Sequence, residues 1–350
     1  MSTIKSNTIK AKSPHKVYIS FLSVLSAFAV VCLHVNTDFW NFSNDSRWLA
    51  SNIIECVFYF AVPIFFMISG ATLIDYRKRY TTKQYFKKRF SRIVIPFLFW
   101  SILSGIFVYF RSSGGSHLGV RSIIQGILNT EYNGIFWFFP ALFSVYLAFP
   151  ILSNIDDEKK EELFKYIIIA GVFLNIVFPL CCKLLNIKYS DNLVFPLVGY
   201  SLYAVVGYYI DKYKLSAKTR KTIYVLGTIG LLVHIIGTAA LSVNAGELVL
   251  TFKGYLNLPC FLYSVAIFTF FKYVKSKKTK HIMDKISHPF TRYTFGVYLV
   301  QFFVLSAIYR ADWINLYSLP IKIILMPITF LICLSITWII SRIPLLNKTV

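Results

Sequence analysis

The stretch VYISFLSVLSAFAVVCLHVN, residues 17–36, contains no Asp, Glu, Lys or Arg. A helix needs about 20 mostly apolar residues to cross the hydrocarbon core of a bilayer. This stretch is too long for the apolar core of a signal peptide, and no small-residue cleavage site follows it. It therefore predicts an uncleaved first transmembrane helix.

Nine further apolar runs follow along the chain. They are residues 49–74, 93–110, 134–153, 163–182, 193–210, 223–243, 254–273, 290–309 and 320–340. Hydrophobic residues make up 56% of the 350 residues and charged residues 15%, and the mean hydropathy is +0.61. A soluble domain carries roughly 25% charged residues, so this composition excludes a soluble protein. It predicts an all-α, polytopic membrane helix bundle of about ten transmembrane helices.

The apolar runs fill the chain so fully that no separate soluble domain fits between them. We expect one transmembrane domain over residues 17–343, a basic tail at residues 1–16 and a short tail at residues 344–350. The longest external segment, residues 111–133, has a Ser/Gly turn at 112–116 and then an amphipathic piece around Val120–Leu128. That piece predicts an interfacial or re-entrant segment beside an external cleft.

The charge distribution orients the bundle. The chain carries 37 Lys and Arg residues against 15 Asp and Glu, a net charge of +22. If the N-terminus is cytoplasmic, 29 of the 37 cationic residues fall in cytoplasmic segments and 8 on the opposite face. Lys and Arg accumulate on the cytoplasmic side of membrane proteins, so we expect both termini to be cytoplasmic. Because almost no soluble surface remains to present these cations to DNA or RNA, we expect no nucleic-acid partner.

The six cysteines lie within or at the edge of apolar runs and lack the spacing of a zinc site. We interpret them as small buried hydrophobic side chains. The sequence predicts no metal site.

Ionisable side chains inside a bilayer are costly, so each one is a candidate functional residue. Three lie within the predicted spans: His34, Glu55 and His234. His34 lies about 26 Å from the cytoplasmic start of the first helix, and Glu55 about 28 Å from the cytoplasmic end of the second, at 1.5 Å per residue. At this shared depth a carboxylate beside an imidazole would suit a general base. The alternative interpretation is a polar pair that only holds two helices together.

His234 stands alone among apolar residues of the seventh run. A neutral imidazole that bonds to a neighbouring helix accounts for it.

The predicted cytoplasmic loop between the second and third helices is strongly basic. It contains Arg77, Lys78, Arg79, Lys83, Lys87, Lys88, Arg89 and Arg92. These cations are explained by topological anchoring alone. They would also attract a polyphosphate group such as that of coenzyme A, or the head group of an anionic lipid.

Several motifs in order resemble the acyltransferase 3 family of multi-pass membrane acyltransferases, whose members O-acetylate bacterial surface sugars. The segment most typical of the family is VPIFFMISG at residues 62–70. The other matching segments are AVVCLHV at 29–35, KRFSRIVIP at 88–96 with Trp100, FWFF at 136–139, FPIL at 149–152, Gly199-Tyr200, GYY at 207–209 and FGVYL at 295–299. Trp48, Asn52 and Phe60 make the chain most similar to compact members that acetylate cell-envelope polysaccharides.

The resemblance implies an O-acyltransferase of the bacterial plasma membrane. It implies transfer of an acetyl group from cytoplasmic acetyl-CoA to a hydroxyl of a surface or lipid-linked glycan, with membrane lipids as surroundings and no permanently bound cofactor. The nucleotide would dock on Arg77, Lys88, Arg89 and Arg92, with Arg89 and Arg92 the strongest candidates.

For the catalytic centre, His34 with Glu55 behind it would take the proton from the acceptor hydroxyl. Tyr298 and Gln301 would donate hydrogen bonds to the developing oxyanion. A covalent acyl-His34 relay is an alternative mechanism.

Two positions depart from the family pattern. Ser23 stands where the family commonly has arginine, and Gln301 where it often has histidine. These departures leave open a catalytically inactive relative of the family. The number of predicted helices and the intramembrane charges also leave open a flippase or transporter of a lipid-linked glycan. The absence of an internal repeat at helical-pair spacing disfavours a transporter built from inverted repeats.

Overall fold

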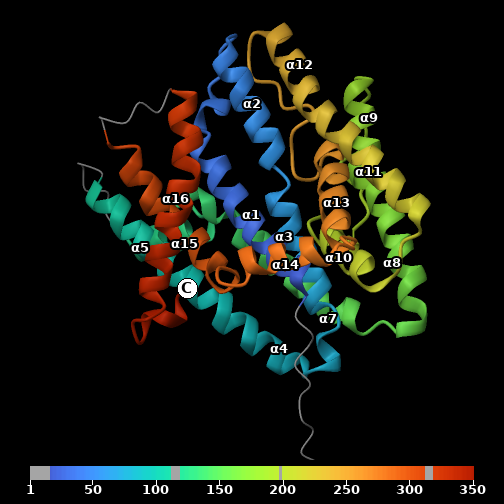
Figure 1. Cartoon of the computed structure of the whole chain (residues 1–350), viewed down its shortest axis with the longest axis horizontal. Coiled ribbons are helices and arrows are strands. Elements are labelled where there is room, and N and C mark those ends of the chain that lie inside the picture. Colours follow the sequence, from blue (N-terminus) through green and yellow to red (C-terminus); the bar gives the residue numbers. More distant parts are fainter. Residues whose placement is uncertain (1–15, 112–118, 197–198, 312–317) are drawn as a thin grey trace, which may run out of the picture.

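The computed structural model describes residues 16–111, 119–196, 199–311 and 318–350, and within these ranges the chain forms helices and no strands. The helices pack side by side in one bundle (Figure 1). Their bounds are α1 Val17–Val35, α2 Ser46–Phe58, α3 Ala61–Leu73, α4 Thr82–Arg89, α5 Ile95–Arg111, α6 Val120–Leu128, α7 Phe138–Ser153, α8 Asp157–Val172, α9 Phe178–Leu184, α10 Ser201–Lys212, α11 Ala217–Leu232, α12 Thr238–Ala245, α13 Leu258–Lys272, α14 Lys277–Ser287, α15 Thr294–Ile308 and α16 Leu319–Ile340. The predicted all-α helix bundle is confirmed.

Eight helical stretches in the described residues are long and apolar enough to cross a membrane, or nine if a bent pair counts as one span. The sequence predicted about ten, and the difference lies at residues 193–210 and 254–273. There α10 has 12 residues and α13 has 15. A helix of 12 residues extends about 18 Å at 1.5 Å per residue, which is less than the core of a bilayer, about 30 Å. Among the described residues of these two runs, 193–196, 199–200 and 254–257 lie outside helices.

The bent pair is α13 with α14, which turn by 110° relative to each other. α14 begins at the side-chain cap of Ser276, whose hydroxyl accepts from the backbone N–H of Thr279. It lies across the bundle and packs against α1 (Figure 1). The predicted cytoplasmic loop around residues 272–292 therefore contains an amphipathic helix that runs along the end of the bundle.

Three of the long helices contain a short π-helical turn. These turns are Phe90–Val94 between α4 and α5, Phe173–Val177 between α8 and α9, and Val233–Gly237 between α11 and α12. A π-turn inserts an extra residue into the helix without ending it, and such turns are frequent at functional sites. Two of the three carry residues that the sequence singled out, Arg92 and His234.

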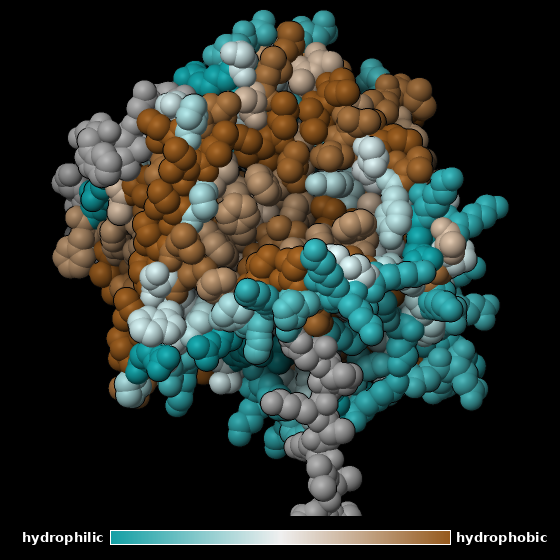
Figure 2. Space-filling view, viewed as in Figure 1, coloured by the Kyte–Doolittle hydropathy of each residue, from teal (hydrophilic) through white to brown (hydrophobic). Residues whose placement is uncertain are grey.

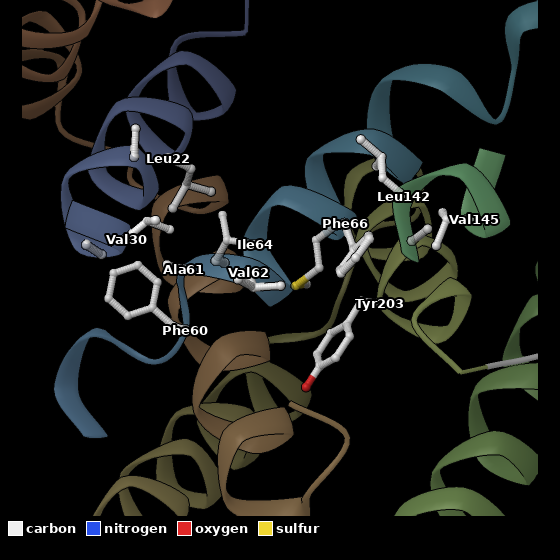
Figure 3. Close-up of a cluster of buried hydrophobic side chains, with 14 of the residues drawn as sticks. Leu22, Val30, Phe60, Ala61, Val62, Ile64, Phe66, Leu142, Val145 and Tyr203 are labelled. Carbon is white, nitrogen blue, oxygen red and sulfur yellow. The ribbon is translucent and has the colours of Figure 1, made fainter. Parts of the chain in front are cut away.

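The closest helix crossing in the core joins α3 to α10. A Cβ added at Gly70 would lie 1.8 Å from the carbonyl oxygen of Ala204, and one at Gly207 would lie 2.2 Å from that of Met67. Only glycine permits backbones to approach this closely, as in other membrane helix pairs. Figure 3 shows the apolar side chains around α3, with Ile64 and Phe66 from α3 and Tyr203 from α10.

The outer surface matches a lipid environment. Large apolar side chains are exposed on several helices, including Ile102, Ile169, Ile229 and Leu331. In Figure 2 the apolar surface forms a broad belt, and hydrophilic side chains gather toward the bottom of the view. An exposed apolar area of this extent marks a membrane-facing surface.

The amphipathic piece in the external segment forms α6, with the predicted bounds Val120–Leu128. Val120, Ile124 and Leu128 are exposed along one side of the helix. The Ser/Gly turn at 112–116 and residues 1–15 of the basic tail lie outside the described residues.

Ion pairs tie the helix ends together. Near the end of α3, Asp75 accepts hydrogen bonds from Lys160 of α8 at 3.2 Å and from Tyr208 of α10 at 2.9 Å. At the opposite end of the bundle, Lys322 of α16 pairs with Asp38, next to α1. These contacts fix the helices that surround the cavity described next.

Candidate active site

A cavity of about 790 Å³ runs through the bundle and connects two groups of polar residues. One group is cationic and comprises Arg79, Lys88, Arg89 and Arg92. The other lies near the C-terminal ends of α1 and α2 and includes His34, Glu55, Trp40, Tyr59 and Tyr255. The volume lies within the range of small-molecule sites, roughly 300–1,000 Å³. A single ligand space therefore links the basic loop to His34.

The cationic end of the cavity is formed where the chain leaves α3 and enters α4. A capping box starts α4, in which Thr81 accepts from the backbone N–H of Gln84 and the Gln84 side chain accepts from the backbone N–H of Thr81. Lys88 and Arg89 close α4, and Arg92 follows in the π-turn. This local structure turns three cations of the basic loop toward one cavity.

Arg89 is the cation best placed to receive an anion. Its Nε atom is buried and has no hydrogen-bond partner, and its guanidinium lies 5.9 Å from the ring centroid of Tyr146. Lys88 lies over the ring of Tyr80, with Nζ 4.0 Å from the centroid. A buried donor without a partner is costly, and Arg89 Nε remains available to a hydrogen-bond acceptor in the cavity.

Of the four predicted nucleotide contacts, the structure brings Lys88, Arg89 and Arg92 to the cavity and leaves Arg77 outside its lining. Arg77 instead donates from Nε to the Ser153 hydroxyl at 3.2 Å. Arg79 takes its place, with a guanidinium nitrogen that donates to the Thr72 carbonyl. Sequence spacing alone does not separate Arg77 from Arg79, because both lie in a short connection between helices.

His34, in the last turn of α1, lines the cavity and contacts Gln301 of α15. The distance from His34 Nδ1 to Gln301 Oε1 is 3.2 Å. Gln301 Nε2 donates to the backbone carbonyl of Tyr298 at 3.2 Å, which turns the amide oxygen toward His34. Because an amide oxygen can only accept, Nδ1 carries the proton, and Nε2 keeps its free electron pair. This tautomer can act as a base through Nε2.

Glu55 also lines the cavity, but the structure gives it partners other than His34. Its Oε1 accepts from Lys253 Nζ at 2.8 Å, and its Oε2 accepts from Asn36 Nδ2 at 3.3 Å. The prediction that Glu55 pairs with His34 is therefore wrong. One cationic donor and one amide donor already hold the carboxylate. Gln301 occupies the position next to the imidazole.

Tyr298 and Gln301 were predicted to donate to an oxyanion, and both donors are engaged in this structure. The Tyr298 hydroxyl donates to the Ile135 carbonyl at 2.6 Å. Gln301 is fully buried and does not line the cavity, whereas Tyr298 does. The geometry therefore assigns Gln301 to the orientation of His34.

Sequence reasoning missed Lys253, which it had counted among the external loop cations. Its side chain is almost fully buried against Glu55. Nζ lies 3.4 Å from the ring centroid of Tyr59 and 4.6 Å from that of Phe39. The available signal was a lone lysine within an otherwise apolar stretch that begins a predicted span, TFKGYLNLPC at residues 251–260.

His234 is fully buried, and neither ring nitrogen has a hydrogen-bond partner. The prediction that His234 forms a hydrogen bond with a neighbouring helix is therefore wrong. The residue lies in the π-turn Val233–Gly237, where its ring makes an edge contact with Tyr59 at 5.4 Å between centroids. The neighbouring amide of Asn52 donates to the carbonyl of Ile235 rather than to the imidazole.

Ser23, the first departure from the family pattern, lines the cavity between its two ends. Its hydroxyl is 3.2 Å from that of Thr294, which also lines the cavity. Two small hydroxyl side chains thus occupy a position where an arginine would add a cation. Among the described residues, no group of three or more His, Cys, Asp or Glu side chains is placed to hold a metal ion.

Comparison with known proteins gives one match. A family model described as an acyltransferase domain matches residues 16–342, nearly the whole chain. Neither the curated proteins nor the solved structures contain a match.

Proposed function

The chain belongs to the acyltransferase 3 family and is a membrane acyltransferase, and we propose that it transfers an acetyl group from cytoplasmic acetyl-CoA to a hydroxyl of a cell-surface or lipid-linked polysaccharide. One observation carries the proposal. A single cavity joins the cationic cluster Arg79, Lys88, Arg89 and Arg92 to His34. A donor with a phosphate-rich head and a reactive group at the end of a long arm fits such a space.

The donor head would bind at the cationic end. Arginine forms paired hydrogen bonds with phosphate oxygens, and lysine adds a point charge. Arg89 offers an unsatisfied Nε donor for this purpose. Among the described residues no acidic side chain lines this end of the cavity, so the cations there would attract the anionic head without an opposing negative charge. The arm of coenzyme A would then extend along the cavity toward His34.

The reaction at His34 is an acyl transfer with general-base catalysis. The acceptor oxygen forms a bond to the thioester carbonyl carbon as His34 Nε2 takes the hydroxyl proton. The C–S bond then breaks, and the proton passes from His34 to the sulfur. The products are an acetyl ester and the free thiol of coenzyme A. Gln301 keeps Nδ1 protonated throughout, so that Nε2 faces the reacting groups.

The acceptor would enter from the end opposite the cationic cluster. There the lining includes Trp40, Tyr59, Trp137 and Tyr255 together with the carboxylate of Glu55. Aromatic faces pack against the apolar faces of sugar rings, and a carboxylate accepts hydrogen bonds from hydroxyl groups. With the termini in the cytoplasm of a bacterial cell, this end faces the outside of the plasma membrane.

The O-acetyl content of the surface glycans tests the proposal directly. Proton NMR would compare a deletion strain with the same strain carrying wild type or His34→Ala. We expect acetyl signals to vanish on deletion and to return only with the wild-type protein. Unchanged acetylation together with an accumulated glycan precursor would support a transporter. Unchanged acetylation without any precursor would support an inactive relative, to which the departures Ser23 and Gln301 would then contribute.

A further inference from the structure

The loop between α12 and α13, residues 246–257, joins two neighbouring helices (Figure 1). Its Tyr255 lines the end of the cavity opposite the cationic cluster. Gly246 and Gly254 have φ angles of +70° and +149°, which permit the reversals of this short segment. Its backbone is held inside the protein, because the Tyr203 hydroxyl donates to the Tyr255 carbonyl and Asn257 Nδ2 donates to that of Thr251. Non-helical chain at membrane depth is tolerated where protein buries it or where it lines a cavity.

Lys253 is the charged residue of this loop that reaches inward. Its Nζ lies 2.8 Å from Glu55 Oε1. The same atom lies 3.4 Å from the ring centroid of Tyr59 and 5.2 Å from that of Trp40. A lysine ammonium within about 6 Å of an aromatic ring centroid is attracted to the ring. Glu55 and Tyr59 belong to the end of α2, and Trp40 to the turn after α1, so one cation joins these two segments to the loop.

All three of these partners line the cavity, whereas Lys253 does not. Lys253 stands behind them, with only 7% of its surface exposed. A buried ion pair alone says little about function. What distinguishes Lys253 is that its ion-pair partner Glu55 and two of the three rings beside it, those of Tyr59 and Trp40, form the wall of the cavity at the end where the acceptor would enter.

We propose that Lys253 is a positioning residue that sets the acceptor end of the cavity by holding Glu55, Tyr59 and Trp40 in place. The inference rests on the proposed acetyl transfer. It gives the two ends of the cavity different roles. Lys253 positions the wall that binds the acceptor, and the cationic cluster binds the donor. Loss of Lys253 would loosen the acceptor wall and leave the donor site intact.

The test is a steady-state comparison of wild type, Lys253→Met and Lys253→Arg in membranes, with protein abundance measured for each. The acceptor probe is an oligosaccharide released by mild acid from the surface polysaccharide of the cells that make the protein. The donor half is followed separately as thiol release from acetyl-CoA with water as the acceptor. We expect Lys253→Met to raise the KM for the oligosaccharide at least tenfold and to change the KM for acetyl-CoA less than twofold. Lys253→Arg keeps the cation and should restore most of the acceptor KM.

Lys160→Met is the matched control. Lys160 is also a buried lysine in an ion pair, with Asp75, but it lies at the other end of the bundle. It should leave the KM for the oligosaccharide unchanged. If Lys253→Met does not reach the membrane, Lys253→Gln removes the cation but keeps a polar side chain beside Glu55, and it should still show the raised acceptor KM.

An unchanged acceptor KM in Lys253→Met, or in Lys253→Gln where it is used, would overturn the inference. An equal rise in both KM values would do the same, because it would indicate general distortion. If wild type itself neither releases thiol from acetyl-CoA nor modifies the oligosaccharide, the proposed function fails, and that result differs from a failure of the Lys253 inference alone.

Discussion

The hydrogen bond between His34 and Gln301 determines which ring nitrogen of the histidine is free to act as a base. Gln301 is itself oriented by the Tyr298 carbonyl, so the two hydrogen bonds form a short chain from the α15 backbone to the imidazole. The amide carries no charge, so it orients the ring without adding a formal negative charge beside it. Gln301, which departs from the family pattern, thus orients the His34 ring in this structure.

Gln301→Leu should lower kcat because the imidazole loses the acceptor that fixes its tautomer. We expect a fall of about 10- to 100-fold, since a well-placed general base contributes about 10²–10⁴. Gln301→Glu keeps an acceptor at this position and should retain more activity than Gln301→Leu. The KM for acetyl-CoA should be the same in both variants, measured by thiol release. Full activity in Gln301→Leu would contradict the orienting role.

Arg89→Ala should raise the KM for acetyl-CoA, because Arg89 supplies the unpartnered donor at the cationic end. A hydrogen bond to a charged group contributes about 1.5–3 kcal/mol, so we expect a rise of roughly 10- to 100-fold. The matched control is Arg77→Ala, which removes a neighbouring arginine that bonds to Ser153 outside the cavity lining. Equal effects of the two substitutions would indicate a general influence of loop charge instead of a defined phosphate site.

The sequence predicted several residues that line the cavity, but it did not predict which of them contact each other. Lys88, Arg89, Arg92 and His34 were predicted and do line one cavity. The pairing of His34 with Glu55 was wrong, because equal depth on adjacent helices does not fix the direction in which each side chain points. Lys253 was missed because the positive-inside pattern counts a lysine near a span end as a surface residue, whether or not the loop folds inward.

At the scale of single elements, the α3–α10 crossing supports the cavity wall. Ser69 and Thr72 of α3 line the cavity, while the opposite side of the helix meets α10 through Gly70 and Gly207. The backbone contact leaves no room for a side chain at either glycine.

Gly207→Val should destabilise the protein, because its side chain would collide with the α3 backbone at Met67. Overpacking a tight interface costs typically about 1–3 kcal/mol. The expected result is earlier loss of monodisperse protein on heating in detergent, together with reduced activity. Gly134→Ala is the control, because a Cβ there meets nothing within 4 Å. Equal thermal stability of the two variants would contradict the close crossing.

Element boundaries show why the number of spans could not be predicted from apolar runs alone. Residues 201–210 and 258–272 are helical as expected, but the described residues before them, 193–196, 199–200 and 254–257, are not. Hydropathy reports how apolar a segment is, and an inward-folded loop buried by protein is as apolar as a helix. The left-handed backbone at Gly254 and the cap at Asn257 are the local features that start α13 late.

At the scale of the whole molecule, the positions of charged residues predict which side faces the cytoplasm. The cationic end of the cavity and the start of α8 lie at the same end as the C-terminal ends of α3 and α10, as the contacts of Asp75 show. Lys322 and Asp38 pair at the other end.

A thiol-labelling experiment would test this topology. In a Cys181→Ser background, which removes an exposed cysteine, single cysteines would replace Asn129 beyond α6 or Lys159 at the start of α8. A membrane-impermeant maleimide should label Asn129→Cys in intact cells and Lys159→Cys only after the membrane is permeabilised. The reverse pattern would place the termini outside, and acetyl-CoA could then not reach the cationic end from the cytoplasm.

The central claim is that one cavity carries an acetyl group from a donor on the cytoplasmic face to an acceptor on the other. Sealed inside-out membrane vesicles that contain the surface glycan in their lumen would receive acetyl-labelled acetyl-CoA from the outside medium. With wild type, the label should appear in the lumenal glycan as a base-labile ester. With His34→Ala at equal abundance, it should fall by at least about 100-fold, as expected for loss of a general base. Transfer by His34→Ala at the wild-type rate, or no transfer by wild type, would contradict the account.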